Sequence, residues 1–489
     1  MSNAKTTALV SLIQSMAKSE KRHFKLYSNR LPGSKDAIYI KIFDLLESSP
    51  LKDDDLIKRK LKLKNTAQFV NSKRHLYNQI LKSLRLLYAQ KHAQIGINEE
   101  IDYATILAHK HLYQDSYIYL DRLDIPSNEY YTQNLLNITE IKRRLASHLD
   151  LTQINFDNVI SETRAQLEID WKIDDLYNEL KKDFSLLGYT RNDRENTLRH
   201  ERFQSKINSF QYRRLSSLQQ FNYHELNILF YRNTWNYRGM YKNAYHQYEL
   251  LATIPYHKNE DHYIKLFIQS LSTILNTCYL HKNKSKYNYW YSILINKISD
   301  YNTTREKHGS ALVEVPEYIN LYSSILNCRY SININVNRDI SNDVDHEYNL
   351  LKSRYLAYQG LYEDAIEIIN KVLNAGNIST EISLYARLHQ VLFHYRLNNF
   401  ELVKNLLPAL RLAFKTAGHF NKTINSVLTF TGKGVKALNF GMKDEINDLQ
   451  IKLKVYSKTP YENIPFLYFD FYNWFECIKL NINVSDLKR

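Results

Sequence analysis

Basic residues near the start of the chain have the types and spacing that could bind nucleic acid. The seven-residue run KRKLKLK contains five basic residues: Lys58, Arg59, Lys60, Lys62 and Lys64. Lysine and arginine neutralise backbone phosphates without reading sequence. The acids Asp53–Asp55 just before the run give a second interpretation, because acids at the start of a helix and bases at its end both complement the helix dipole. This alternative does not explain why the basic residues continue past the expected helix end.

A helix expected over Thr66–Gln90 carries a second set of polar side chains. At 100° per residue one of its faces is apolar, and the opposite face holds Asn71, Arg74, His75, Asn78, Lys82 and Arg85. Arginine can pair bidentately with guanine and asparagine with adenine, so this face suits the major groove of DNA. The alternative interpretation is the solvated side of an ordinary amphipathic helix, and the spacing alone fits both.

Motifs typical of catalysis or metal binding do not stand out. The TGKG segment Thr431–Gly434 lacks the GxxxxGK[ST] spacing of a phosphate loop and follows no expected strand, so we interpret its glycines as a helix irregularity or a close-packing point. His109 and His111, like His389 and His394, are spaced so that two such side chains diverge on a helix. We therefore expect a protein that is not an enzyme and holds no cofactor or metal.

Composition indicates an all-α fold. The 489 residues include only 11 glycines and 8 prolines, and 44% of the chain is hydrophobic, which predicts long helices around a sizeable core. No apolar run reaches 18 residues, so no membrane association is expected. Three widely spaced cysteines, Cys278, Cys328 and Cys477, indicate neither a disulfide framework nor a zinc site, which favours a cytoplasmic location.

Positive charge is concentrated at the start of the chain. Residues 1–94 hold 19 Lys and Arg against 7 Asp and Glu, whereas residues 95–489 hold 47 against 44. The pattern there predicts short helices over residues 7–16, 19–29, 35–47, 52–61 and 66–90. The last three are laid out as in a helix-turn-helix module, without a diagnostic motif. Such a charge excess suits a phosphate backbone or an acidic protein surface.

The remaining chain is organised around one pair of helices within Leu351–Ala375. The first helix is expected to end at Gly360, where glycine can take a left-handed conformation, and the second begins near Tyr362. Tyr362 fills the gap at the turn, and Ala365 is small enough to let neighbouring helices approach closely. This spacing resembles the helix-turn-helix unit of a tetratricopeptide repeat.

A second copy of the unit is expected around Gly239, Tyr241 and Ala244. Gly239 lies 121 residues before Gly360, and Gly441 lies 81 residues after it, so both gaps are close to multiples of about 40. The resemblance implies an all-α, tetratricopeptide-like helical-repeat solenoid with a small basic N-terminal helical module. The expected parts are the module at 1–94, a first repeat part at 95–220 and a second at 221–489.

Three further segments give more specific expectations. The long helical pattern Phe156–Leu187 has a candidate break at Asp170–Asp175, and the charged, weakly periodic stretch Arg191–Leu218 suggests an exposed arm or a junction. Eight aromatic residues lie in Pro460–Leu480, which predicts a terminal helix covered on more than one side. That helix either packs into the last repeats or forms a homo-oligomer or partner surface.

Two functional hypotheses follow. In the first, the protein is an adaptor or scaffold whose solenoid groove binds a protein or peptide partner while the basic module docks an acidic surface. In the alternative, residues 1–94 bind DNA or RNA and the solenoid senses a ligand or oligomerises. The second layout looks like that of peptide-sensing transcription regulators with a helix-turn-helix head and tetratricopeptide-like repeats, although no residue motif carries the comparison further.

Overall fold

The computed structural model consists of helices joined by turns, and its described part contains no β-strand. It describes residues 2–30, 37–48, 54–62, 65–90, 92–123, 132–149, 151, 155–251, 253, 260–306, 314–327, 346–375, 378–437 and 442–487. The chain divides into two compact units, unit 1 at Met1–Glu168 and unit 2 at Ile169–Arg489. The expected boundaries after residues 94 and 220 stay predictions.

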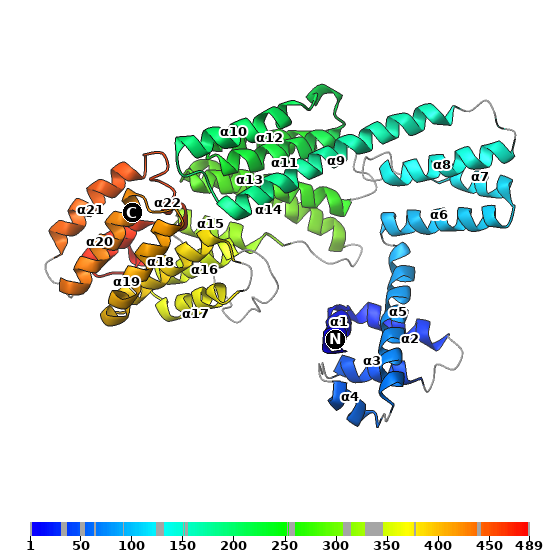
Figure 1. Cartoon of the computed structure of the whole chain (residues 1–489), viewed down its shortest axis with the longest axis horizontal. Helices are drawn as coiled ribbons and strands as arrows, with labels where there is room; N and C mark the ends of the chain where they lie inside the picture. The colour runs from blue at the N-terminus through cyan, green and yellow to red at the C-terminus, as the bar shows by residue number, and fades with distance from the viewer. Residues whose placement is uncertain are drawn as a thin grey trace. The chain divides into compact units, whose positions relative to one another are not determined.

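Unit 1 begins with five helices around one core (Figure 1): α1 (Ser2–Ser15), α2 (Lys18–Asn29), α3 (Ile38–Ser48), α4 (Asp54–Lys60) and α5 (Thr66–Ala89). Apolar side chains from all five helices meet in this core, among them Ile13, Phe24, Phe43, Ile57 and Leu76. Because α4 and the start of α5 follow α3 closely, the three helices can share one core as the short connections predicted.

The rest of unit 1 consists of longer helices: α6 (Ala93–His109), α7 (Tyr113–Asp121), α8 (Thr132–His148) and the first part of α9 (Phe156–Leu187). α6 and α7 form a hairpin, and α8 packs against both of them. The turn is made by His111, whose φ of 63° lies in the left-handed region. A second short core joins Leu136, Ile160 and Leu167 along α8 and α9.

Unit 2 continues the series of helices (Figure 1). After the end of α9 they are α10 (Asp193–Asn208), α11 (Ser217–Asn233), α12 (Tyr237–Leu251), α13 (Glu260–Leu280), α14 (Lys284–Glu306), α15 (Glu317–Asn327), α16 (His346–Tyr358), α17 (Tyr362–Leu373), α18 (Thr380–Arg396), α19 (Phe400–Thr416), α20 (Lys422–Ala437), α21 (Lys443–Tyr456), α22 (Pro465–Tyr468) and α23 (Phe471–Leu480). Two 3₁₀ turns, η3 (Tyr212–Arg214) and η4 (Val484–Asp486), complete the described elements.

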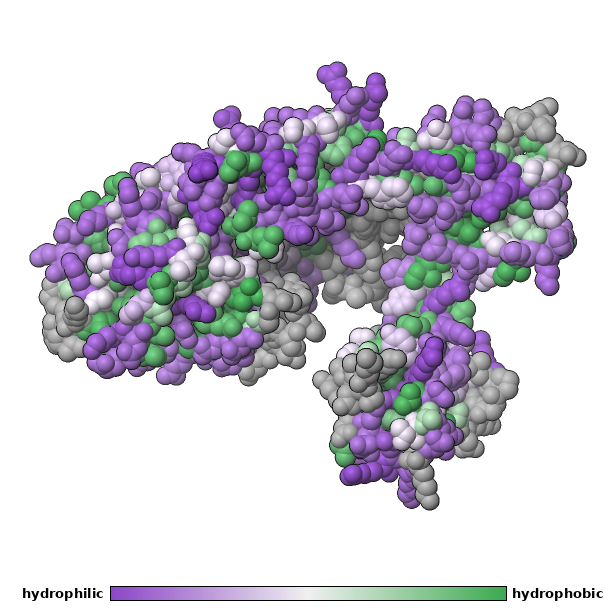
Figure 2. Space-filling model, viewed as in Figure 1, coloured by the Kyte–Doolittle hydropathy of each residue, from purple (hydrophilic) through white to green (hydrophobic). Residues whose placement is uncertain are grey.

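Successive helices pack on one another along unit 2. α11 packs on α12, α12 on α13 and α13 on α14, and the same order holds from α15 through to α21. Such a series, in which each helix contacts its neighbours in sequence, is the arrangement of a helical solenoid. The predicted all-α solenoid-like fold is therefore confirmed. On the face seen in Figure 2, most of the described surface of unit 2 is hydrophilic.

α16 and α18 form an inner layer of unit 2. Every residue of α16 from Asn349 to Tyr358 is buried, and buried side chains also surround α18. By contrast, α17 and α19 bury one face each, as helices open to solvent on the other side do. The second side of the inner layer is covered by a segment that we call the C-terminal segment, residues 464–487.

Aromatic rings of the C-terminal segment complete this core. Trp474 and Phe475 are buried, and the Trp474 ring lies 6.0 Å from Phe393 of α18. The Tyr468 ring stacks on Tyr385 of the same helix at 3.9 Å. These rings therefore pack into the last helices of unit 2, the first of the two alternatives. A homo-oligomer stays a prediction, and the buried rings would not form its surface.

The two expected helix pairs have different turns. Gly360 ends α16 with a φ of 87°, and Asn483 lies so close that a Cβ on Gly360 would be 2.6 Å from its side-chain nitrogen. Gly239 instead lies inside α12, where a Cβ would be 2.6 Å from the ring of Tyr231. The turn before α12 is made by Trp235, whose φ is 59°. Gly239 thus admits a neighbouring ring and does not end a helix.

Small residues allow close helix packing in both pairs. Ala244 and Ala365 are fully buried, and Tyr362 is 9% exposed. Tyr241 accepts a hydrogen bond at its hydroxyl from the indole Nε1 of Trp290, 3.1 Å away. Gly441, the third expected helix-ending glycine, lies outside the described residues.

In the middle of the chain, one expectation is wrong and one of two alternatives is contradicted. α9 runs from Phe156 to Leu187 without the break expected at Asp170–Asp175. Part of Arg191–Leu218 is not an exposed arm, because α10 buries Phe203 and Ile207 against Leu226 and Phe230 of α11. Arg199 of α10 is buried as well, and its Nε donates to Asp183 of α9 at 2.7 Å. One of the charges that suggested exposure, Arg199, is therefore paired inside the unit.

Candidate functional site

The polar face expected on α5 is exposed in unit 1. Its six members, Asn71, Arg74, His75, Asn78, Lys82 and Arg85, are all exposed to solvent. Three apolar side chains, Val70, Leu81 and Leu86, are also at least 42% exposed on α5. The helix therefore presents a mixed basic, amide and apolar face.

Buried contacts fix the orientation of α5. Asn65 caps its first turn by accepting a hydrogen bond from the backbone of Gln68 at 3.1 Å. Phe69, Leu76 and Ile80 are buried in the shared core of α1–α5, as the apolar face predicted. With one face held in the core, the opposite face has to point to solvent.

A buried ion pair joins α4 to α5. The Lys73 ammonium donates to both carboxylate oxygens of Asp54 at 2.7 Å, and the two side chains are only 7% and 12% exposed. Asp54 also complements the dipole of its own helix, and no sequence pattern indicates a partner 19 residues away. This pair holds the start of α4, and hence the basic run, beside the middle of α5.

Some of the candidate basic residues are already paired. Arg85 lies 2.7 Å from Asp102 of α6, and Lys58 lies 2.7 Å from Asp55. Arg59, Lys60 and Lys62 are placed at and just after the end of α4, all of them exposed. Lys64 lies outside the described residues.

Two strong cations remain on the α5 face. Neither Arg74 nor Lys82 has an ion pair with any residue that the structure describes. The neighbouring His75 ring packs edge-on against Tyr39, with the ring centroids 4.8 Å apart. Arg74 and Lys82 are therefore the cations of the exposed α5 face that lack an ion pair within the described structure, and Asn71 and Asn78 lie on the same face.

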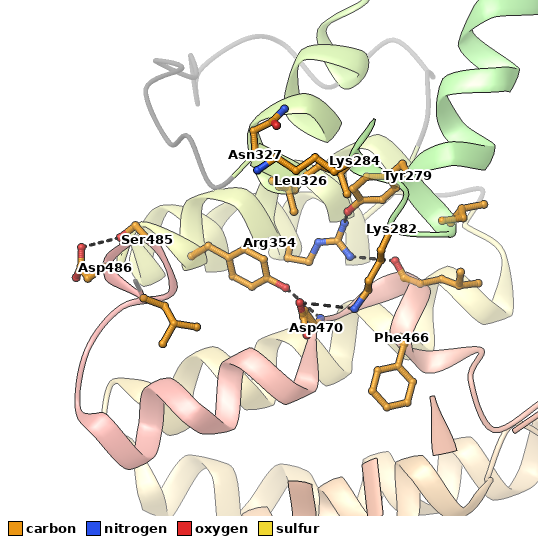
Figure 3. A pocket seen from close by; sticks show the side chains of 15 residues that line it. Tyr279, Lys282, Lys284, Leu326, Asn327, Arg354, Phe466, Asp470, Ser485 and Asp486 are labelled. Carbon is orange, nitrogen blue, oxygen red and sulfur yellow. Dashed lines mark hydrogen bonds and ion pairs between the residues drawn. The ribbon is translucent and has the colours of Figure 1, made fainter. Parts of the chain in front are cut away.

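Unit 2 contains a cavity of about 610 Å³, which we call the unit 2 cavity (Figure 3). Its size is in the range of ligand-binding clefts. Four parts of the unit supply its walls: the end of α13 with the turn to α14, the end of α15, α16 and the C-terminal segment. Its aromatic, charged and amide lining residues include Tyr279, Lys282, Lys284, Asn327, Arg354, Tyr358, Phe466 and Asp470.

Arg354 of α16 lies at the middle of this cavity in Figure 3. It is only 4% exposed. One terminal nitrogen donates to the Leu467 carbonyl oxygen at 2.9 Å, and the other donates to the Tyr279 hydroxyl. Its Nε has no hydrogen-bond partner among the described residues. Both of these hydrogen bonds are to neutral groups, although the Asp470 carboxylate also interacts electrostatically with the guanidinium.

Side chains of the inner layer recognise the main chain of the C-terminal segment. Besides Arg354, His389 places Nε2 3.1 Å from the Tyr468 carbonyl oxygen. The Asp470 N–H donates to the Tyr358 hydroxyl at 3.0 Å. Arg396 donates to the Ile482 carbonyl oxygen at 3.0 Å. Main-chain recognition by side chains at the inner face of a solenoid is the chemistry that a peptide ligand requires.

A second polar cluster lies between the start of α18 and the turn after α9. Glu381 is 4% exposed and accepts a hydrogen bond from the Tyr189 backbone N–H at 3.2 Å, and the Tyr468 hydroxyl also interacts with its carboxylate. Burial raises the pKa of Glu381 to about 7. Nearby, Arg191 donates to the Ala417 carbonyl oxygen at 2.8 Å. The cluster joins distant parts of unit 2 and does not line the unit 2 cavity.

The histidines considered as metal ligands have other surroundings. Burial lowers the pKa of His389 to about 3, so this ring is neutral inside the core. No group of three or more His, Cys, Asp or Glu side chains among the described residues could hold a metal ion. Thr431–Gly434 lies within the continuous helix α20, where a Cβ on Gly434 would overlap the Tyr395 hydroxyl. That glycine is therefore a close-packing point.

Comparison with known proteins gives no family for this chain. No family model matches it, and no curated protein or solved structure does. Among the described helices, none combines the length and apolar character needed to cross a membrane. The two candidate sites are therefore the exposed α5 face of unit 1 and the unit 2 cavity.

Proposed function

We propose that the protein is a non-enzymatic adaptor or scaffold of the tetratricopeptide-like kind, which binds a peptide or protein segment in the unit 2 cavity. The basic module of residues 1–94 would dock an acidic surface in the same assembly. The proposal places this activity in the cytoplasm. It assigns the described helix pairs a framework role and the cavity a binding role.

The observation that carries this proposal is the unit 2 cavity itself. Its walls combine rings for apolar contact, Tyr279, Tyr358 and Phe466, with charged and amide groups that can orient a ligand. The main-chain contacts of α16 and α18 to the C-terminal segment support a peptide ligand, because an added segment would need contacts of the same kind.

A substitution that fills the cavity tests the proposal. Ser485 lines the cavity, whereas Ser292 lies on the exposed side of α14 outside it. We expect Ser485→Tyr to lose a partner protein that the wild-type chain retains from a nuclease-treated native lysate. Ser292→Tyr should retain it. Equal recovery of the same partner by both variants would contradict a role for the cavity.

A second candidate function is nucleic-acid binding by unit 1. The exposed α5 face favours it, because Arg74 and Lys82 have no ion pair in the described structure and stand beside two asparagines. Such a face can combine phosphate contacts with base contacts. If the protein is a nucleic-acid-binding regulator, the unit 2 cavity would bind the ligand that it senses.

Salt dependence distinguishes this function from docking on an acidic protein. We expect the full chain to bind duplex DNA or RNA with an affinity that falls steeply between 50 and 200 mM salt, as each phosphate contact adds about one unit to the slope. Arg74→Ala with Lys82→Ala should reduce both affinity and slope. The control is Lys18→Ala with Arg22→Ala, which removes the same charge from exposed positions of α2. If both pairs weaken binding equally, only net charge matters and the α5 face is not the site.

A further inference from the structure

Two arginines are buried in the described part of unit 2, and they differ in how their charge is balanced. Arg199 and Arg354 are 6% and 4% exposed. Arg199 forms an ion pair with Asp183 at 2.7 Å. Arg354 forms none with any residue that the structure describes, and its hydrogen-bond partners are a carbonyl and a hydroxyl. A buried charge is costly unless it is paired, and Arg354 lacks a directly contacting counter-ion such as the one that Arg199 has. The Asp470 carboxylate acts on Arg354 electrostatically, but the two form no ion pair in the described structure.

Arg354 also has N–H donors that no described residue uses. A guanidinium has five N–H donors, and Arg354 uses two of them in the contacts to Leu467 and Tyr279. Its planar group can therefore still donate to a carboxylate, the acceptor whose geometry it matches best. Since the residue lines the unit 2 cavity, a ligand there is in a position to supply that acceptor.

Two lysines at the cavity add positive charge. Lys282 and Lys284 lie in and after the turn between α13 and α14, and both are exposed. Figure 3 shows them on opposite sides of Arg354. Lys284 has no ion pair with a described residue. An anion entering the cavity would thus meet a lysine before it reaches the arginine.

The acids at the cavity already have other contacts. Asp470 caps α23 by accepting from the Asn473 N–H at 3.4 Å, and it lies 3.8 Å from the Lys282 ammonium. Asp486 accepts a hydrogen bond from the Ser485 hydroxyl at 3.1 Å. Among the described residues that line the cavity, two carboxylates therefore stand against three cations, which is a positive excess.

We propose that the unit 2 cavity binds the carboxylate group of a peptide, with Arg354 as the principal contact and Lys284 as the contact at the entrance. The inference rests on the proposed function and specifies the chemistry of the ligand. The half-buried ring of Phe466 would pack against the apolar part of the peptide next to its carboxylate. Either the C-terminus of the peptide or an acidic side chain can supply the group.

Four pools of N-acetylated random hexapeptides test the ligand chemistry and separate its two sources. The pools carry a free C-terminal carboxylate or an amide, each with or without Asp and Glu among the randomised residues. The immobilised full chain is exposed to each pool, and the retained peptides are measured by mass spectrometry. We expect the neutral amide pool to be retained roughly tenfold less than at least one pool with a carboxylate. Retention of the acid-free carboxylate pool identifies the C-terminus, and retention of the acidic amide pool identifies side chains.

Variants of the cavity locate the contact. Arg354→Gln should reduce retention of the carboxylate peptides by roughly tenfold or more. Because Arg354 is buried, its variant also needs a circular dichroism spectrum matching that of the wild type. Lys284→Ala changes an exposed residue and should reduce retention about two- to fivefold. Lys286→Ala is the matched control, since Lys286 is exposed two residues further along α14 and does not line the cavity.

The outcomes separate this inference from the proposed function. If the neutral amide pool is retained as well as the others, and Lys284→Ala has no effect, the carboxylate assignment is wrong while a peptide-binding function stands. If carboxylate peptides are retained but Lys284→Ala and Lys286→Ala behave alike, the assigned contacts are wrong. If no pool is retained, the proposed peptide-binding function fails and the inference fails with it.

Discussion

Lys73 and Asp54 show at the residue scale how unit 1 is held together. Their buried ion pair links α4 to α5 beside the shared apolar core, and removal of one member leaves the other charged and desolvated. We expect Lys73→Met to lower the free energy of unfolding by about 3 kcal/mol. Urea denaturation followed by circular dichroism measures this change.

An exposed ion pair in the same module provides the control. Lys25 lies within 3.0 Å of both Asp44 and Glu47, but its side chain is 46% exposed. Lys25→Met should therefore change stability by less than about 1 kcal/mol. Equal effects of the two substitutions would show that burial of the Lys73 pair does not matter.

Glu381 gives a prediction about pH. Its pKa is raised to about 7 in the folded chain, so the folded state holds a proton that the unfolded state releases above its ordinary value of 4.5. Its contribution to stability is full below that value and is lost as the pH rises through about 7. Glu381→Gln replaces the carboxyl group with a neutral amide, so the variant does not lose this stability as the pH rises. We expect the variant to be more stable than the wild type at pH 8 by about 2–3 kcal/mol, and not at pH 5.

The difference between variant and wild type isolates this group. Burial lowers the pKa of His389 to about 3 and that of His419 to about 4, so both rings make stability rise with pH up to their ordinary range. These two contributions are the same in both proteins and cancel in the difference. Urea denaturation at several pH values from 5 to 8 provides the measurement. A difference that stays constant over this range would contradict the raised pKa.

Glycines at the element scale separate turns from helix interiors. Gly360 has a φ of 87° and faces Asn483, so Gly360→Ala forces a side chain into the left-handed region and against a neighbour. Gly432 lies in α20, where the nearest atom to an added Cβ is 3.8 Å away. We expect Gly360→Ala to destabilise the chain by about 1–2 kcal/mol and Gly432→Ala to stabilise it by about 0.5–1 kcal/mol.

Thermal unfolding of the two variants tests that contrast. Opposite signs would show that the α16–α17 turn depends on glycine at position 360. A loss of the same size in both variants would instead mean that alanine is tolerated equally at the two positions, and that the turn has no special requirement.

Element identities were largely predictable because they depend on local periodicity. The pattern predicted a helix over Thr66–Gln90, and α5 covers Thr66–Ala89. The break expected at Asp170–Asp175 does not occur, because clustered acids on an exposed face are compatible with a continuous helix. The spacing of Gly239 to Tyr241 predicts a turn at Gly239. Spacing alone does not reveal that the Tyr231 ring packs against Gly239 and leaves no space for a Cβ.

Contacts between distant residues could not be predicted in the same way. Arg354 and Leu467 are 113 residues apart, and Lys73 and Asp54 lie on different helices. Neither Arg354 nor Lys73 is marked as buried by the sequence, because a lone arginine or lysine in a helical pattern is normally exposed. The unit 2 cavity was therefore absent from the predicted sites, whereas the α5 face was found from periodicity alone.

At the scale of the whole molecule, few glycines and prolines and the helix pair within Leu351–Ala375 were enough to predict an all-α solenoid-like chain. The near-40-residue spacing is weaker support, because Gly239 lies inside α12 and does not mark a turn. Charge identified the basic module, but charge does not distinguish a phosphate backbone from an acidic protein. That choice depends on which partner is recovered and on whether binding depends on salt. The account gives each unit a separate role, with recognition of a peptide assigned to unit 2.

Site-specific photo-crosslinking tests this assignment most directly. A benzoylphenylalanine is placed at Leu326, which lines the unit 2 cavity, or at Ser292, which does not. Both full-length variants are irradiated in nuclease-treated native lysate. The account predicts a discrete protein or peptide adduct at position 326 and none at 292, reduced in the presence of Lys284→Ala. The absence of an adduct at 326, or the same adduct at both positions, would contradict it.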